Sequence, residues 1–205
     1  MSAQRRAFGW CDLAAIRRRS VSMATSWLPG ALWLLVGMSV LQIAGAQQAA
    51  IERQVKAAYL FKFGSYITWP DRAFPAADSP IRIGVLGADD LAEELAQMAA
   101  GKTVNGRPLS IRRIQRDEAL PDLNVLFVSR SHKDKLDKIL AATRGQSIVT
   151  VSDFDDYAAH GSMINFVIVD GRLRFEISLR PAQQENISIS ARLLAAAHRV
   201  TTGPS

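Results

Sequence analysis

The side chains that most often build catalytic or metal sites are histidine, cysteine and activated serine. The three histidines, His132, His160 and His198, are far apart in the sequence and form no His-Glu-x-x-His or comparable ligand pattern. We therefore expect them at the surface or at the domain boundary. No Gly-x-Ser-x-Gly sequence presents a nucleophilic serine. The sequence thus predicts no catalytic residue and no enzyme activity.

Two other segments could contact a phosphate group or a cation. Gly84–Gly87 follows an expected strand, but it has neither the Gly-x-Gly-x-x-Gly order nor the lysine of a phosphate loop, so a tight strand-to-helix turn explains it better. Asp153, Asp155 and Asp156 form an acidic cluster that lacks the glycine and the distal glutamate of a calcium loop. We expect Asp153 to cap a turn or a short helix. No metal and no cofactor is predicted.

The N-terminal segment has the order of a secretory signal peptide. Residues 1–19 carry five arginines against one aspartate. Ala31–Ile43 is an apolar run of 13 residues, and small side chains follow it up to Ala46. Basic, apolar and small residues in this order predict export with cleavage after Ala46. Residues 1–46 would then be the signal peptide, and residues 47–205 the mature domain in the periplasm.

An uncleaved membrane anchor is the alternative for this segment. About 20 apolar residues are needed to span a bilayer, whereas Gly37, Ser39 and Gln42 interrupt this run. Translation could also start at Met23, although that start would discard all five arginines. Cleavage therefore explains the pattern better than anchoring.

The mature domain is close to neutral and free of cysteine. The chain has 25 Lys and Arg and 19 Asp and Glu, and residues 1–46 hold five of the former and one of the latter, which leaves 20 against 18. Nucleic acid requires clustered basic residues, so no nucleic-acid partner is predicted. Because Cys11, the single cysteine, lies in the leader, the mature domain has no disulfide and no thiol nucleophile.

Strand and helix patterns alternate along the mature domain. Short β-branched runs predict strands, and apolar residues at helical spacing predict helices. The alternation indicates a single α/β domain with a mainly parallel sheet, helices on both faces and a C-terminal antiparallel hairpin. The expected strands are 81–86, 109–114, 125–128, 148–151, 163–169 and 173–179, and the expected helices are 51–63, 89–100, 133–143 and 182–199.

Two of these elements carry more detailed expectations. Asp170-Gly171 supplies the positive φ angles of a two-residue hairpin turn. In the strand that follows, Arg174 and Glu176 alternate with apolar residues, so we expect them on a solvent-exposed face. The residues at helical spacing in the first helix are Ile51, Val55, Ala58, Tyr59 and Lys62.

Aromatic residues are concentrated at the end of the first helix and in the turn after it. Five of them lie within 11 residues, namely Tyr59, Phe61, Phe63, Tyr66 and Trp69. One narrow helical stripe cannot bury all five, so one or two are expected to be partly exposed and to contact a partner. The alternative is that all five complete the core. Phe154, just after a strand, has the same two interpretations.

Four segments in order resemble the YfiR family of exported bacterial proteins. They are VKAAYLFKFGSYITWP (Val55–Pro70), IRIGVLG (Ile81–Gly87), GSMINFVIVDGRLRFEIS (Gly161–Ser178) and ISARLLAAA (Ile189–Ala197). The resemblance implies a periplasmic repressor that binds the periplasmic domain of an inner-membrane diguanylate cyclase of the YfiN type. Repression would lower cyclic di-GMP, exopolysaccharide and biofilm. The protein would meet the membrane only through that partner, and its oligomeric state, a homodimer included, stays open.

One departure from the family concerns regulation. Well-known members carry cysteine pairs that tune release of the cyclase with redox state, so their absence from this mature chain means that redox control by that route is not expected. The aromatic crowding and the matching segments suggest where the partner would bind. The expected partner-binding residues are Phe63, Tyr66, Trp69, Phe154, Asn165 and Glu176.

A periplasmic small-molecule sensor or solute-binding module without a cyclase partner is the second interpretation. In that case the crevice beyond the strand ends would hold the ligand. A neighbouring gene for a membrane diguanylate cyclase would favour the repressor. A neighbouring transporter or sensor kinase gene would favour the sensor.

Overall fold

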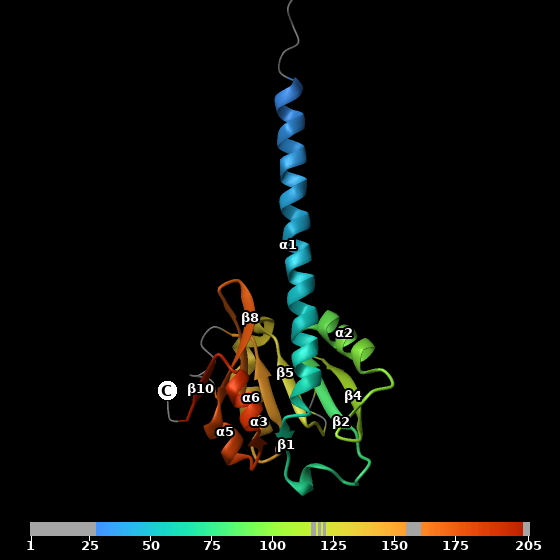
Figure 1. Ribbon diagram of the computed structural model, residues 1–205, viewed down its shortest axis with the longest axis vertical. Helices are drawn as coiled ribbons and strands as arrows, with labels where there is room; N and C mark the ends of the chain where they lie inside the picture. The colour runs from blue at the N-terminus through green and yellow to red at the C-terminus, as the bar shows by residue number, and fades with distance from the viewer. Residues whose placement is uncertain (1–27, 116–117, 119, 121, 155–160, 203–205) are drawn as a thin grey trace, which may run out of the picture. The chain divides into compact units, whose positions relative to one another are not determined.

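The computed structural model describes residues 28–115, 118, 120, 122–154 and 161–202 (Figure 1). The chain is divided into two compact units, residues 1–43 and residues 44–205. Helix α1 (Leu28–Phe63) begins in the first unit and ends in the second. Within the described part, no helix has both the length and the apolar character needed to cross a membrane. The arginine-rich start of the predicted signal peptide lies outside the described residues, and cleavage after Ala46 stays a prediction.

The second unit is an α/β domain built on an eight-stranded sheet. Its strands are β2 (Ile81–Leu86), β3 (Thr103–Val104), β4 (Arg107–Ile114), β5 (Val125–Val128), β6 (Val149–Ser152), β7 (Ile164–Val169), β8 (Arg172–Ser178) and β10 (Arg199–Thr201). The strand order is β10-β8-β7-β6-β5-β2-β4-β3. Neighbours from β4 to β7 are parallel, β8 is antiparallel to β7, and β3 is antiparallel to β4. The predicted mainly parallel sheet is confirmed.

Short helices and a small second sheet complete the domain. The remaining elements are β1 (Ile67–Thr68), η1 (Asp71–Ala73), α2 (Asp89–Ala99), η2 (Arg130–Lys135), α3 (Leu136–Thr143), α5 (Leu179–Gln184), β9 (Ser188–Ile189) and α6 (Ala191–Ala196). β1 and β9 pair with each other in an antiparallel manner.

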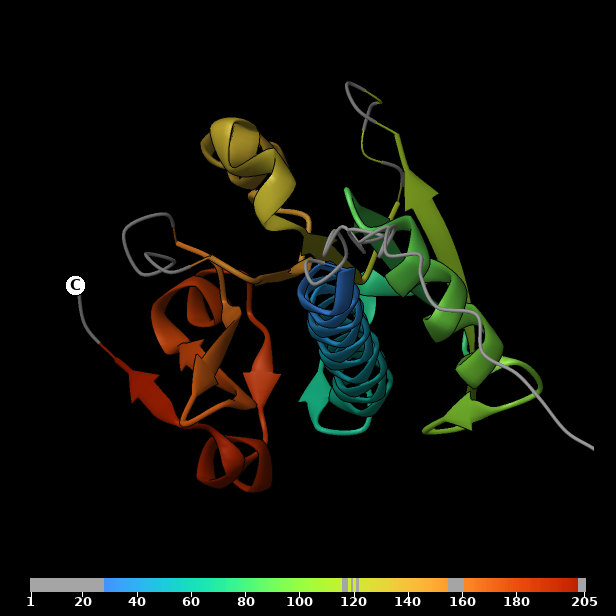
Figure 2. The same cartoon turned by 90° about the horizontal axis from the view of Figure 1, so that it is seen from above.

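Hydrophobic side chains form one cluster on each face of the sheet. Leu60 of α1 and Leu95 of α2 pack with Phe127 on one face. Leu140 of α3 packs with Leu126 on the other face. Because successive residues of a strand point to opposite faces, the unbroken apolar run of β5 contributes side chains to both clusters. Figure 2 shows α3 on the opposite side of the central strands from α1.

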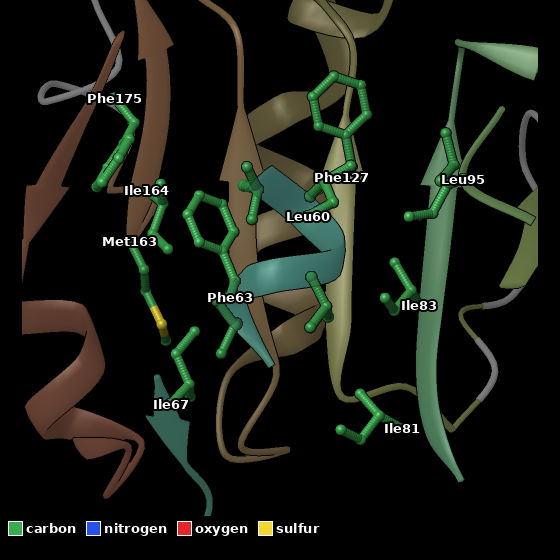
Figure 3. Close-up of a cluster of buried hydrophobic side chains, with 14 of the residues drawn as sticks. Leu60, Phe63, Ile67, Ile81, Ile83, Leu95, Phe127, Met163, Ile164 and Phe175 are labelled. Atoms are coloured by element: carbon green, nitrogen blue, oxygen red, sulfur yellow. The ribbon is translucent and has the colours of Figure 1, made fainter. Parts of the chain in front are cut away.

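The end of α1 is fixed by aromatic packing. Figure 3 shows Leu60 and Phe63 among the side chains of the sheet. The Phe63 ring lies 5.5 Å from the Phe175 ring and 6.0 Å from the Phe166 ring, measured between centroids. Tyr59 adds an edge contact to Phe175 at 5.2 Å. Such pairs contribute about 0.5–1.5 kcal/mol each beyond area burial.

The predicted hairpin turn is confirmed. Asp170 has φ 50° and Gly171 has φ 69°, which are the left-handed angles that a two-residue turn between twisted strands requires. The turn sets the register of β7 against β8, in which Phe166 lies opposite Phe175. The hairpin therefore brings two of the core aromatic rings together.

The predicted closing helix over 182–199 is wrong. The chain instead forms α5, β9, α6 and β10 in that span. Asn186 takes φ 55°, which ends the helical path after α5. The Ser190 hydroxyl accepts a hydrogen bond from the Leu193 backbone N–H at 3.3 Å and so caps a new helix.

Glu176 is not on a solvent-exposed face. β10 pairs with β8 in parallel and places Arg199 beside Glu176. Glu176 is 5% exposed, and its Oε1 lies 3.5 Å from Arg199 Nε. The contact with Arg199 was not predicted, because a helix was expected where β10 forms.

Candidate functional site

A cavity of about 730 Å³ opens at the carboxyl ends of the parallel strands. Its lining includes the residue that directly follows each of four strands: Gly87 after β2, Gln115 after β4, Ser129 after β5 and Asp153 after β6. β2 lies between β4 and β5 in the sheet. After β2 the chain first adds β3 and β4 on one side of it, and then adds β5 and β6 on the other side. Ligands of open α/β sheets bind at this type of switch point. We call this cavity the strand-end cleft.

Helix α1 supplies one wall of the strand-end cleft through Ala49, Glu52, Arg53 and Lys56. The Lys56 side chain is only 9% exposed, and its Nζ lies 2.7 Å from Asp153 Oδ2. The same Nζ lies 2.7 Å from Glu52 Oε1, one helical turn away. A buried ammonium group is tolerated only when it is paired, so this lysine ties α1 to the end of β6.

Asp153 connects three elements at the floor of the cleft. Its Oδ2 accepts the Lys56 hydrogen bond, and its Oδ1 accepts the backbone N–H of Arg130 at 2.7 Å. Arg130 is the first residue of η2, so Asp153 caps a short helix, as the sequence analysis expected. Asp155 and Asp156, the other members of the predicted acidic cluster, lie outside the described residues.

The opposite wall is formed by the β2–α2 turn against η2. Gly87 has φ 76°, and a Cβ atom at this position would collide with the Ser131 hydroxyl and the His132 ring. The Ser131 hydroxyl donates to the Gly87 carbonyl at 3.1 Å and lies 3.0 Å from His132 Nδ1. Glycine is therefore required at position 87 for this close approach. The predicted tight turn is confirmed at Gly87 only, because Gly84 to Leu86 belong to β2.

Carboxylates outnumber cationic side chains in the lining of the cleft. The acidic members are Glu52, Asp89, Asp90 and Asp153, and the basic members are Arg53 and Lys56. Arg53 Nη1 lies 3.5 Å from Asp90 Oδ2 across the mouth. The lining side chains alone carry a formal charge of about −2, and Arg130, whose Nε lies 3.6 Å from Asp153 Oδ2, reduces the excess to about −1.

A second carboxylate network lies beside Gln115 at the rim. The Gln115 backbone N–H donates to Glu118 Oε2 at 2.9 Å, and Arg112 Nη2 donates to Glu118 Oε1 at 2.6 Å. The hydrogen bond from Gln115, followed by the contacts with Arg112, lowers the pKa of Glu118. Glu118 therefore stays ionised to lower pH than an isolated glutamate.

The structure buries five of the six expected partner-binding residues. Phe63 is fully buried, and Trp69, Phe154, Asn165 and Glu176 are at most 8% exposed. Tyr66 is partly exposed. The six are spread over the end of α1, β1 and the sheet, and none of them lines the strand-end cleft.

Two of the three polar or amphipathic members of this buried set, Trp69 and Asn165, bond to the backbone. The Trp69 indole N–H donates to the Asn124 carbonyl at 3.1 Å. The Asn165 amide donates to the Phe154 carbonyl at 2.7 Å and accepts from the Phe154 N–H at 3.0 Å. These bonds fix the backbone just before β5 and just after β6.

The aromatic cluster follows the first interpretation in part. Phe63 and Trp69 are buried, whereas Tyr59, Phe61 and Tyr66 keep partial exposure while packing against the core. Three of the five are therefore partly exposed, whereas one or two were expected.

Lys56 is the central residue that the sequence analysis missed. A lysine side chain is normally expected to point to solvent, and Lys56 was not among the residues at helical spacing. It is nevertheless buried, as is its neighbour Ala57. Within the described residues, no group of three or more histidine, cysteine or carboxylate side chains is placed to hold a metal ion. His132 lines the cleft and is partly exposed, His198 is exposed, and His160 lies outside the described residues.

Comparisons with known proteins identify the family. The comparison with curated proteins found no match. Among solved structures, a conserved domain protein from Vibrio cholerae is similar at 14% identity with a TM-score of 0.46, and the match covers 59% of this chain and 55% of that protein. A family model described as YfiR/HmsC-like matches residues 53–198, which include Lys56 and Asp153. The chain therefore belongs to the YfiR/HmsC-like family.

Proposed function

We propose that this protein is exported to the periplasm and represses an inner-membrane diguanylate cyclase of the YfiN type by binding its periplasmic domain. The family match over residues 53–198 is the observation that carries this proposal. The basic, apolar and small segments of residues 1–46 support export. The protein acts by binding and needs no catalytic step of its own.

Repression of this kind is a binding equilibrium. The protein lowers cyclase activity only to the extent that it binds the inactive state more tightly than the active state. A coupling of about 1–3 kcal/mol changes the active fraction about 5- to 150-fold. Lower cyclic di-GMP would reduce exopolysaccharide and biofilm.

Deletion of the gene is expected to raise cellular cyclic di-GMP several-fold, within the range of about 5- to 150-fold set by such a coupling. The full-length gene supplied in trans should restore the wild-type level. Mass spectrometry of extracted nucleotides measures both. Unchanged cyclic di-GMP in the deletion strain would contradict repression.

Tyr66 gives the sharpest variant at the proposed partner surface, because it keeps partial exposure while the other five residues are buried. Tyr66→Ala is expected to weaken binding of the cyclase periplasmic domain about tenfold or more, as for an aromatic interface residue. Titration calorimetry with the purified domains measures the affinity.

Phe61→Ala is the matched control for Tyr66→Ala. Phe61 is also aromatic, partly buried and packed against the same core, but it is not among the expected partner-binding residues. Equal affinities of the two variants would remove Tyr66 from the partner surface. Urea unfolding of both variants separates a loss of contact from a loss of folding.

A sensor module without a cyclase partner is the second candidate. The strand-end cleft favours it, because its size falls within the range of small-molecule sites. This candidate predicts unchanged cyclic di-GMP in the deletion strain, so the deletion experiment also separates the two functions.

A further inference from the structure

We propose that the strand-end cleft binds a small organic cation with an aliphatic body, such as an alkyl diamine. This site would be additional to the partner surface, and it does not depend on cyclase binding.

The cleft is large and is built from the ordered parts of the domain. Its volume of about 730 Å³ exceeds what a few water molecules need and lies within the range of about 300–1,000 Å³ typical of ligand sites. Four strand ends, α1 and the first turn of α2 line it, and it is open to solvent. The Lys56–Asp153 ion pair holds the floor and the α1 wall together without filling the cavity.

The charge of the cleft selects a cation. Both basic side chains are already paired, Lys56 with Glu52 and Asp153, and Arg53 with Asp90. An anionic ligand would have to compete with these carboxylates, whereas an ammonium group would relieve the excess of negative charge. The positive end of the α2 dipole offsets only part of the charge of Asp89 and Asp90, because it amounts to about half an elementary charge.

Two kinds of neutral surface suit the rest of such a ligand. The side chains of Ala49, Leu91 and Ile114 offer apolar contacts for an alkyl chain. Ser129 and His132 offer hydrogen-bonding groups on the opposite wall. A molecule with an ammonium group and a short alkyl chain matches both the polar and the apolar parts of the lining.

Three four-carbon probes test the proposal. The full chain is expressed with export, the N-terminus of the purified protein is read by mass spectrometry, and putrescine, succinate and 1,4-butanediol are titrated by calorimetry. These probes share a chain length and differ in charge. We expect saturable binding of putrescine at millimolar concentration or below and no binding of the other two. Binding of succinate or butanediol in preference to putrescine, or no binding of putrescine, would overturn the proposal.

Two charge-neutralising variants localise the binding. Glu52→Gln is expected to weaken putrescine binding about tenfold, the effect of losing one charge-assisted contact. Its amide oxygen can still accept a hydrogen bond from Lys56. Glu93→Gln is the control, because Glu93 lies on α2 outside the cleft and its side chain is 61% exposed. Putrescine affinity that is unchanged by Glu52→Gln, or equally lowered by Glu93→Gln, would place the site elsewhere.

Discussion

Lys56→Met is expected to lower the free energy of unfolding by about 3–5 kcal/mol, the usual cost of removing one partner from a buried ion pair. The Asp153 side chain is 5% exposed, so its carboxylate would lose its ammonium partner in a poorly solvated place. Methionine keeps the length and the flexibility of the lysine side chain, so the change isolates the charge. Urea unfolding followed by circular dichroism measures the effect.

Lys62→Met is the matched control on the same helix. Lys62 is exposed, so the same substitution should change the free energy of unfolding by no more than about 0.5 kcal/mol. Adding Asp153→Asn to Lys56→Met should recover part of the loss, because it removes a buried charge whose remaining ion-pair partner, Arg130, is 61% exposed. A Lys56→Met protein as stable as the Lys62→Met protein would show that the ion pair does not hold α1 to the sheet.

Elements defined by short local patterns could be predicted from the sequence. β2 and β5 have the predicted bounds, because a short apolar run between turn residues specifies a buried strand without help from distant contacts. The Asp170-Gly171 turn was predictable for a similar reason, since its backbone angles are open to few residue types. The expected helix over 133–143 is divided into η2 and α3.

The buried face of α1 could not be predicted from hydrophobic periodicity. Among residues 45–63 of this helix, those buried are Lys56, Ala57, Leu60 and Phe63, whereas Ile51 is 48% exposed. The predicted stripe, which contained Val55, Tyr59 and Lys62, is therefore displaced by about one position from the buried face. Burial of Lys56 is favourable because Asp153, 97 residues away, pairs with it together with the local Glu52, and the distant partner cannot be read from the helix pattern.

The cleft depends on strand order, which the sequence does not state directly. Gly87 and Asp153 were considered separately, as parts of a possible phosphate loop and of an acidic cluster. They lie at one site because β2, β5 and β6 are parallel neighbours in the sheet. Glu176 illustrates the same limit, because its ion pair with Arg199 follows from the pairing of β10 with β8.

Phe63→Ala is expected to lower the free energy of unfolding by about 3–5 kcal/mol. Phe63 is fully buried, and its ring contacts the rings of Tyr59, Phe166 and Phe175. The substitution would therefore leave a cavity where α1 meets the β7–β8 hairpin. A loss of this size is a large part of the total stability of an ordinary domain, about 5–15 kcal/mol. Thermal and urea unfolding measure it.

Phe63→Leu separates a core role from a partner role. Leucine keeps much of the buried volume, so the variant should lose less stability than Phe63→Ala and remain folded. If Phe63 only holds the core, the folded Phe63→Leu protein should bind the cyclase domain with wild-type affinity. If Phe63 also shapes the partner surface, the affinity of the folded protein should fall. Unfolding of Phe63→Ala at the wild-type urea concentration would contradict the core role, because no buried contact would then have been lost.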